Sequence, residues 1–251
     1  MKNNKKILNL LFIFLLITTA SFISIPSNAS VVLGGTRVIY NASDAEVSLK
    51  LNNVGKQPGL VQTWIDNGDQ EALPADIDVP FIVTPALARI DPGKGQTLRI
   101  FRSEDINEQD KESVFWLNVL EIPPEAGAKE NDVNQINIAF RSRIKLFYRP
   151  RGLEGRAQET PAKIVWQLKQ EGDKTILIAT NPTPYHFSFS RLEVDNGEKQ
   201  VTYEDGGMVA PGESKTLVLD EKIASSSRMK VIYRAINDYG GRQDGETPIT
   251  P

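Results

Sequence analysis

The stretch NQINIAFRSRIKLFY, at residues 134–148, alternates apolar and polar side chains over most of its length. Because successive side chains of a β-strand point to opposite faces, one face carries the apolar set Ile136, Ile138, Phe140, Ile144 and Leu146. Fifteen residues extend about 50 Å at roughly 3.3 Å per residue, which is long for a small sandwich. A half-buried strand gives the same alternation. The length adds a second interpretation, a strand that overhangs its own core and needs a partner for its exposed edge.

Shorter stretches on both sides of this segment also fit strands separated by turn residues. Before it they lie at 45–52, 60–65, 81–84, 96–101 and 114–122, and after it at 164–168, 175–180, 187–194, 215–219 and 229–235. Residues 150–161 combine glycine, proline and charge, as linkers do. The pattern predicts an all-β protein with two sandwich domains, at residues 30–150 and 151–251.

The first 29 residues have the features of a secretory leader. Three lysines precede an apolar run at residues 7–25, and the small residues Ser27 and Ala29 suit cleavage after Ala29. The alternative is a retained membrane anchor, because the apolar run is nearly long enough to span a bilayer. No later stretch is apolar enough to span, so we expect an exported chain without an integral membrane segment once the leader is removed.

Composition narrows the function classes. Without the leader, which holds three lysines and no acid, the chain has 26 basic and 32 acidic residues and a formal charge of −6. Nucleic-acid binding usually needs a net basic surface, so we expect no nucleic-acid partner. There is no cysteine, and the one histidine is His186, for which a structural or surface role is expected. We predict no cofactor, no metal site and no catalytic residue, while carboxylate chemistry stays open.

Five segments of the sequence resemble a known family, the PapD-like periplasmic pilus chaperones. The resemblance is carried in order by Thr36-Arg37, Trp116 to Pro124, Arg143 to Pro150, Asn181 to Tyr185 and Ile236 to Gly241. It implies two immunoglobulin-like β-sandwich domains set at an angle, with a cleft between them. The short loop before the long strand and the absence of cysteine resemble the short-loop class.

The resemblance also implies site residues. Arg37 and Lys145 match the two cations that anchor the C-terminal carboxylate of a pilus subunit, which charge-assisted hydrogen bonds make physically sound. The donor strand, which supplies the strand that a pilus subunit lacks, would use Ile136, Ile138 and Phe140. Val32 and Leu33 are candidates for the other edge of the subunit's groove. An interdomain ionic network would use Glu121, Arg149 and Asp238.

The function implied is that of a periplasmic chaperone without enzymatic activity. It would bind fimbrial subunits by donor-strand complementation and deliver them to an outer-membrane usher, and free protein could cap itself as a dimer. Two other interpretations stay open from the residues alone. One is a structural or adhesive surface protein, and the other is a secreted hydrolase based on paired carboxylates, for which no convincing pair is found.

Overall fold

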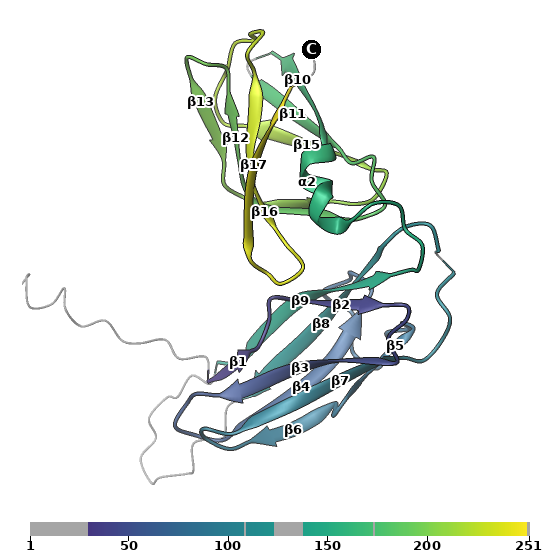
Figure 1. Cartoon of the computed structure of the whole chain (residues 1–251). Helices are drawn as coiled ribbons and strands as arrows, with labels where there is room; N and C mark the ends of the chain where they lie inside the picture. The colour runs from purple at the N-terminus through teal and green to yellow at the C-terminus, as the bar shows by residue number, and fades with distance from the viewer. Residues whose placement is uncertain (1–29, 108, 123–137, 173, 250–251) are drawn as a thin grey trace, which may run out of the picture.

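The first half of the chain forms two β-sheets packed face to face (Figure 1). The computed structural model describes residues 30–107, 109–122, 138–172 and 174–249. The strands of this half are Val31–Leu33 (β1), Arg37–Asn41 (β2), Glu46–Asn53 (β3), Gly59–Asp66 (β4), Phe81–Thr84 (β5), Leu87–Ile90 (β6), Gly95–Arg102 (β7), Ser113–Ile122 (β8) and Phe140–Arg149 (β9). One sheet has the order β1-β3-β7-β5 and the other the order β2-β9-β8-β4-β6.

The core of this domain lies between the sheets and is filled by the inward side chains of each strand. In β3, Leu49 and Leu51 are buried while Ser48 and Lys50 are exposed, and β7 buries Leu98 in the same way. Each large apolar side chain buried like this contributes roughly 1.5–3 kcal/mol before ordering costs are subtracted. The apolar residues of the alternating pattern therefore face the core, and the polar residues between them face the solvent.

The chain changes sheet between β1 and β2, at Gly34 and Gly35. A Cβ on Gly34 would lie 3.0 Å from the carbonyl oxygen of Lys50, which explains why a side chain is disfavoured there. As a result β1 pairs with β3, whereas β2 pairs in parallel with residues 145–149 of β9. Residues 140–144 of β9 pair with β8 on one side. Among the described residues, nothing pairs with the other edge of this half.

The second half of the chain forms a smaller sandwich. Its strands are Val165–Glu171 (β10), Lys174–Thr180 (β11), Phe187–Asp195 (β12), Gln200–Tyr203 (β13), Gly207–Val209 (β14), Ser214–Leu219 (β15), Lys230–Ile236 (β16) and Arg242–Pro248 (β17). One sheet has the order β10-β11-β15, and the other has the order β13-β12-β16-β17, with β14 also paired to β12. Trp166, Leu177 and Leu192 are fully buried between them.

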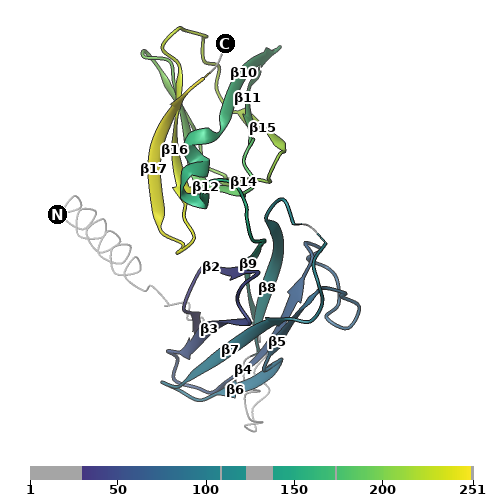
Figure 2. The same ribbon diagram turned by 45° about the vertical axis from the view of Figure 1, so that its right-hand side comes forward.

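The segment expected to be a linker contains two short helical turns, Ala157–Glu159 (η1) and Thr160–Lys163 (α2). Pro161 lies in the first turn of α2, where its missing N–H costs no helical hydrogen bond. Two views show the sandwiches set at an angle, with the β16–β17 loop pointing toward β2 and β9 (Figures 1 and 2). The predicted fold class, two all-β sandwich domains, is confirmed.

The start of the long strand differs from the prediction. The long strand was expected from residue 134, but β9 begins at Phe140, and Ile138 and Ala139 precede it without regular structure. The leader at residues 1–29 and Ile136 lie outside the described residues. In the part of the chain that the structure describes, no helix is both long and apolar enough to cross a bilayer.

Candidate functional site

A cleft of about 390 Å³ lies between the two domains. Strands β2, β8 and β9 of the first domain line one wall, and β12, β16 and the β16–β17 loop line the other. The lining residues are Thr36, Arg37, Trp116, Arg143, Ile144, Lys145, Ser190, Ala235, Ile236, Gly240, Gly241 and Arg242. No acidic side chain is among them, so the cleft has a positive charge.

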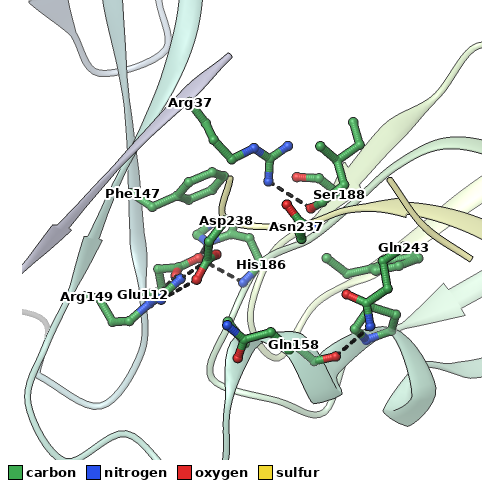
Figure 3. Close-up of a pocket in the computed structure, with 14 residues that line it drawn as sticks. Arg37, Glu112, Phe147, Arg149, Gln158, His186, Ser188, Asn237, Asp238 and Gln243 are labelled. Carbon is green, nitrogen blue, oxygen red and sulfur yellow. Dashed lines mark hydrogen bonds and ion pairs between the residues drawn. The ribbon is translucent and has the colours of Figure 1, made fainter. Parts of the chain in front are cut away.

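Arg37 and Lys145 lie side by side in this wall. They are direct partners in the parallel pairing of β2 with β9, and neighbouring strands lie about 4.8 Å apart. Arg37 extends toward the second domain (Figure 3), where its Nη1 donates a hydrogen bond of 3.0 Å to the carbonyl oxygen of Ile236. Its guanidinium lies 5.6 Å from the centre of the Phe147 ring. The Arg37 Nε atom is buried without a hydrogen-bond partner among the described residues.

Lys145 is a cation without an anion in the part of the chain that the structure describes. Its Nζ lies 5.6 Å from the centre of the Trp116 ring. Burial lowers the pKa of Lys145 to about 8, and the charges of Arg37 and Lys215 add to the effect. Two adjacent cations with unused donors could hold one carboxylate, because hydrogen bonds between charged groups are stronger than those between neutral ones.

The buried carboxylate of Asp66 forms an ion pair with Arg143, one of the cations that line the cleft. Burial alone would raise the pKa of Asp66, but hydrogen bonds from Arg143, Asn118 and Gly68 outweigh it and hold the pKa below its usual value. Asn118 Nδ2 and Gly68 N each donate at 2.7 Å, and Arg143 Nε donates at 3.1 Å. Asp66 thereby holds Arg143 over Trp116, at 4.1 Å from the ring centre.

A second ionic cluster joins the two domains (Figure 3). Arg149 at the end of β9 donates to Glu112 at 2.7 and 2.9 Å and to Asp238 at 2.8 and 3.1 Å. Burial alone would lower the pKa of Arg149, but the hydrogen bonds to these two carboxylates raise it above its usual value. The side chain of His186 is 3% exposed and places Nδ1 2.9 Å from the same carboxylate of Glu112. This cluster ties the start of β8 and the end of β9 to the second domain.

The expectation for Glu121 is wrong, because this residue is not in the ionic cluster. Pairing of β8 with β9 sets Ser113 opposite Tyr148 and Glu121 opposite Phe140, so Glu121 lies at the far end of the sheet from Arg149. Continuing the same register by one residue places Glu112 across from Arg149. The sequence could have identified Glu112, since in an antiparallel pair the end of β9, where Arg149 lies, is next to the start of β8.

The residues expected to fill a subunit's groove lie at the free half of β9. The exposed fractions are 59% for Ile138 and 38% for Phe140, although both are large apolar residues. Ile144, on the same face, packs partly against the core of the first domain. Ile136 lies outside the described residues. The free edge thus carries exposed apolar side chains at alternate positions and leads directly to the cleft.

The described residues contain no group of three or more histidine, cysteine, aspartate or glutamate side chains that could hold a metal ion. The geometry they present instead is an open strand edge beside a positive cleft. This arrangement suits the binding of an extended polypeptide that ends in a carboxylate.

Comparisons with known proteins match both domains. Residues 30–154 match the family described as "Pili and flagellar-assembly chaperone, PapD N-terminal domain", and residues 159–247 match "Pili assembly chaperone PapD, C-terminal domain". The chain is 41% identical over 234 residues to the probable fimbrial chaperone YadV of Escherichia coli (strain K12), across 92% of this chain and 94% of YadV. It is 44% identical over 220 residues to the chaperone protein FimB/FhaD of Bordetella pertussis, across 86% of each chain.

Solved structures agree with the sequence matches. The crystal structure of the YadV chaperone has a TM-score of 0.73 at 39% identity, covering 86% of this chain and 98% of that one. A chain from the Salmonella enterica SafA pilin in complex with the SafB chaperone has a TM-score of 0.69 at 28% identity, covering 89% and 97%. These likenesses include both sandwiches.

Proposed function

The chain belongs to the family of PapD-like pilus-assembly chaperones, and on that premise we propose that it binds fimbrial subunits in the periplasm through the free half of β9. The observation that carries the proposal is the continuity between this free edge and the two-cation cleft. An exposed edge with apolar side chains is normally an aggregation hazard, so a partner that covers it is expected. No enzymatic step is part of the proposed function.

The anchor of the proposed complex is the pair Arg37 and Lys145. A subunit that ends in the cleft places its C-terminal carboxylate between the two cations. Its preceding residues then run along the free edge of β9 and form main-chain hydrogen bonds with it. From Lys145 to Phe140 the strand extends about 17 Å at roughly 3.3 Å per residue, so about five residues of the subunit would pair before the strand ends.

The donated side chains fill the place of the strand that the subunit lacks. Ile138 and Phe140, together with Ile136, would enter the groove between the subunit's sheets. Burial of three such side chains contributes several kcal/mol, at roughly 1.5–3 kcal/mol each, before the cost of ordering. On the other side of the opening, Val32 of β1 is 47% exposed and would meet the subunit's second edge.

Delivery to an outer-membrane usher is the last part of the proposal. It is supported by family membership and by a second exposed apolar surface on the first domain. Leu60 of β4 and Leu87 of β6 are both exposed on neighbouring strands, at the end of the sheet that is remote from the second domain (Figure 1). Neither leucine lines the cleft.

The proposal predicts that Ile138→Asp weakens subunit capture by about 30-fold or more, because a carboxylate would replace an apolar group in the subunit's groove. The free energy of unfolding of the chaperone alone should change by less than about 0.5 kcal/mol, since the side chain is exposed. The measurement is recovery of the complex after co-expression with the fimbrial subunit of the same gene cluster, together with urea unfolding of the free protein.

Ala139→Asp is the matched control, because Ala139 is exposed and would point to the opposite face from Ile138 once the segment is extended as a donated strand. It should retain most of the capture. If Ile138→Asp instead unfolds the free chaperone, Ile138 belongs to an ordinary core. If both aspartate variants capture the subunit as well as wild type, strand donation through this face is excluded.

Capture should also weaken at alkaline pH. The pKa of Lys145 in the free protein is lowered to about 8, and a bound carboxylate favours the charged form and raises it. Affinity is therefore constant below about pH 8 and falls up to about tenfold per pH unit above it. Titration of complex formation between pH 6.5 and 9.5 measures this. Lys145→Arg, which stays charged, should show a flat profile, and an equally steep profile would contradict the assignment.

A further inference from the structure

Glu121 is a buried carboxylate with no cationic partner in the part of the chain that the structure describes. It is 9% exposed and lies at the end of β8, on the face that the core occupies. Its carboxylate accepts hydrogen bonds from the backbone N–H of Val31 at 3.0 Å and from the hydroxyl of Ser30. Within the described part of the chain, no lysine, arginine or histidine forms an ion pair with it. Buried carboxylates are rarely left without a positive partner, because desolvation is costly.

The surroundings of Glu121 are shaped around residue 30. The carbonyl oxygen of Ser30 accepts a hydrogen bond of 2.7 Å from Val54 N. A Cβ on Gly55 would lie 2.4 Å from the Cβ of Ser30, and one on Gly59 would lie 3.5 Å from Glu121 Oε1. Gly55 therefore leaves room for residue 30 beside the carboxylate, and any side chain at position 55 would close that space, whereas a Cβ at position 59 would make only an ordinary contact.

A cationic partner for Glu121 can come from the chain's own N-terminus once the leader is removed. Hydrolysis of the Ala29–Ser30 peptide bond by a leader peptidase consumes one water, leaves a carboxylate on the leader and creates an ammonium group on Ser30. That nitrogen is three bonds from the Ser30 hydroxyl oxygen, which already contacts Glu121. We propose that Glu121 is the binding site for the α-ammonium group of Ser30 that leader removal generates.

This capture of an N-terminal amine would couple processing to the edge used for binding. Glu121 pairs with Phe140 across β8 and β9, and Val31 begins β1, so the ion pair joins both sides of the opening that would hold a subunit. A fixed α-ammonium would stabilise β1 at the sheet edge once the leader is gone. The structural claim stands without a subunit, and only its effect on capture rests on the proposed function.

The test is a double-mutant cycle on the mature protein, with its N-terminus at Ser30 verified by mass spectrometry. The second form keeps Ser27, Asn28 and Ala29 ahead of Ser30, which moves the charged amine away. Glu121→Gln is made in both forms, and urea unfolding is measured at pH 6.5 and pH 9.5. We expect Glu121→Gln to reduce the folding equilibrium constant about tenfold more in the mature form than in the extended form at pH 6.5.

The pH dependence separates an ion pair from a neutral contact. A neighbouring carboxylate raises the pKa of an amine above its ordinary value of about 7.7–8.0, so the stabilisation is complete below that value and lost as the pH rises through the raised pKa. The excess cost of Glu121→Gln in the mature form should thus be small at pH 9.5. Equal costs in both forms at both pH values would overturn the proposal, since they leave only the contacts to the hydroxyl and to Val31.

A measurement on the unmutated protein covers the case in which Glu121→Gln fails to fold. The rate of selective α-amine acylation against pH gives the pKa of the Ser30 ammonium directly. A value clearly above about 8 supports capture by Glu121, whereas a value at or below the ordinary range of about 7.7–8.0 contradicts it. Because neither experiment uses a subunit, a failure here is distinguishable from a failure of the proposed chaperone function.

Discussion

Lys145→Met is expected to weaken subunit capture by about 100-fold or more while making the free protein more stable. Removing one member of a desolvated, hydrogen-bonded charge pair at an interface costs roughly 2–5 kcal/mol of binding free energy. In the free protein the same substitution should increase stability. Lys145 lies beside Arg37 with no anionic partner among the described residues, and its pKa, lowered to about 8 from 10.5, shows that its charge is unfavourable in the folded state.

The gain in stability has a defined pH window. A base with a lowered folded pKa destabilises the protein fully below that pKa, and the effect disappears as the pH rises to the unfolded value. Lys145→Met should therefore raise the free energy of unfolding by about 1–3 kcal/mol at pH 7, and by little near pH 10.5. Methionine keeps an apolar stem beside Trp116, so packing changes little.

Pull-down with the subunit and urea unfolding of the free protein measure the two effects. Lys169→Met, at an exposed position of β10, is the control and should change neither. A Lys145→Met variant that captures subunits normally would contradict the anchor. A variant that loses capture together with stability would show instead that Lys145 supports the fold.

Arg149→Met is expected to cost about 3–5 kcal/mol in the free energy of unfolding. The side chain of Glu112 is 2% exposed and would be left as a buried carboxylate facing only His186. Asp238 would also lose its partner, so the tie between the domains would weaken. Small-angle X-ray scattering should detect a wider distribution of domain orientations.

Two further variants make this prediction specific. Arg89→Met breaks an ion pair between exposed side chains and should cost less than about 1 kcal/mol. The double variant Arg149→Met with Glu112→Gln should recover part of the loss, because no buried charge is then left unpaired. If Arg149→Met costs no more than Arg89→Met, the interdomain cluster does not hold the domains together.

The sequence predicted most of the fold because most strands have one buried face. Strand β17 shows why some could not be found. It reads RQDGETP, and no residue of it is buried, since it is an edge strand that contributes hydrogen bonds to β16 rather than apolar surface. Period-two hydrophobicity cannot detect such a strand, and its pairing is decided by the partner.

The site was predicted more unevenly. Arg37 and Lys145 came from the family resemblance, and their adjacency follows from a parallel pairing that no local pattern announces. Glu112 was missed although strand register selects it. The contacts of Asp66, which fix Arg143 over Trp116, depend on three strands at once, and no spacing along the chain encodes them.

Strand β2 pairs with only the second half of β9, so the length of the free first half is fixed. The proposed anchor, Lys145, and the proposed donor residue, Phe140, lie on the same strand. The distance between them and the faces to which they point are therefore set by the five residues of strand from one to the other. Inserting one residue between them would turn every later side chain to the opposite face. A subunit whose last strand is one residue too long or too short would meet the same mismatch. The chaperone would thus select its clients by the length of their final strand as well as by its composition.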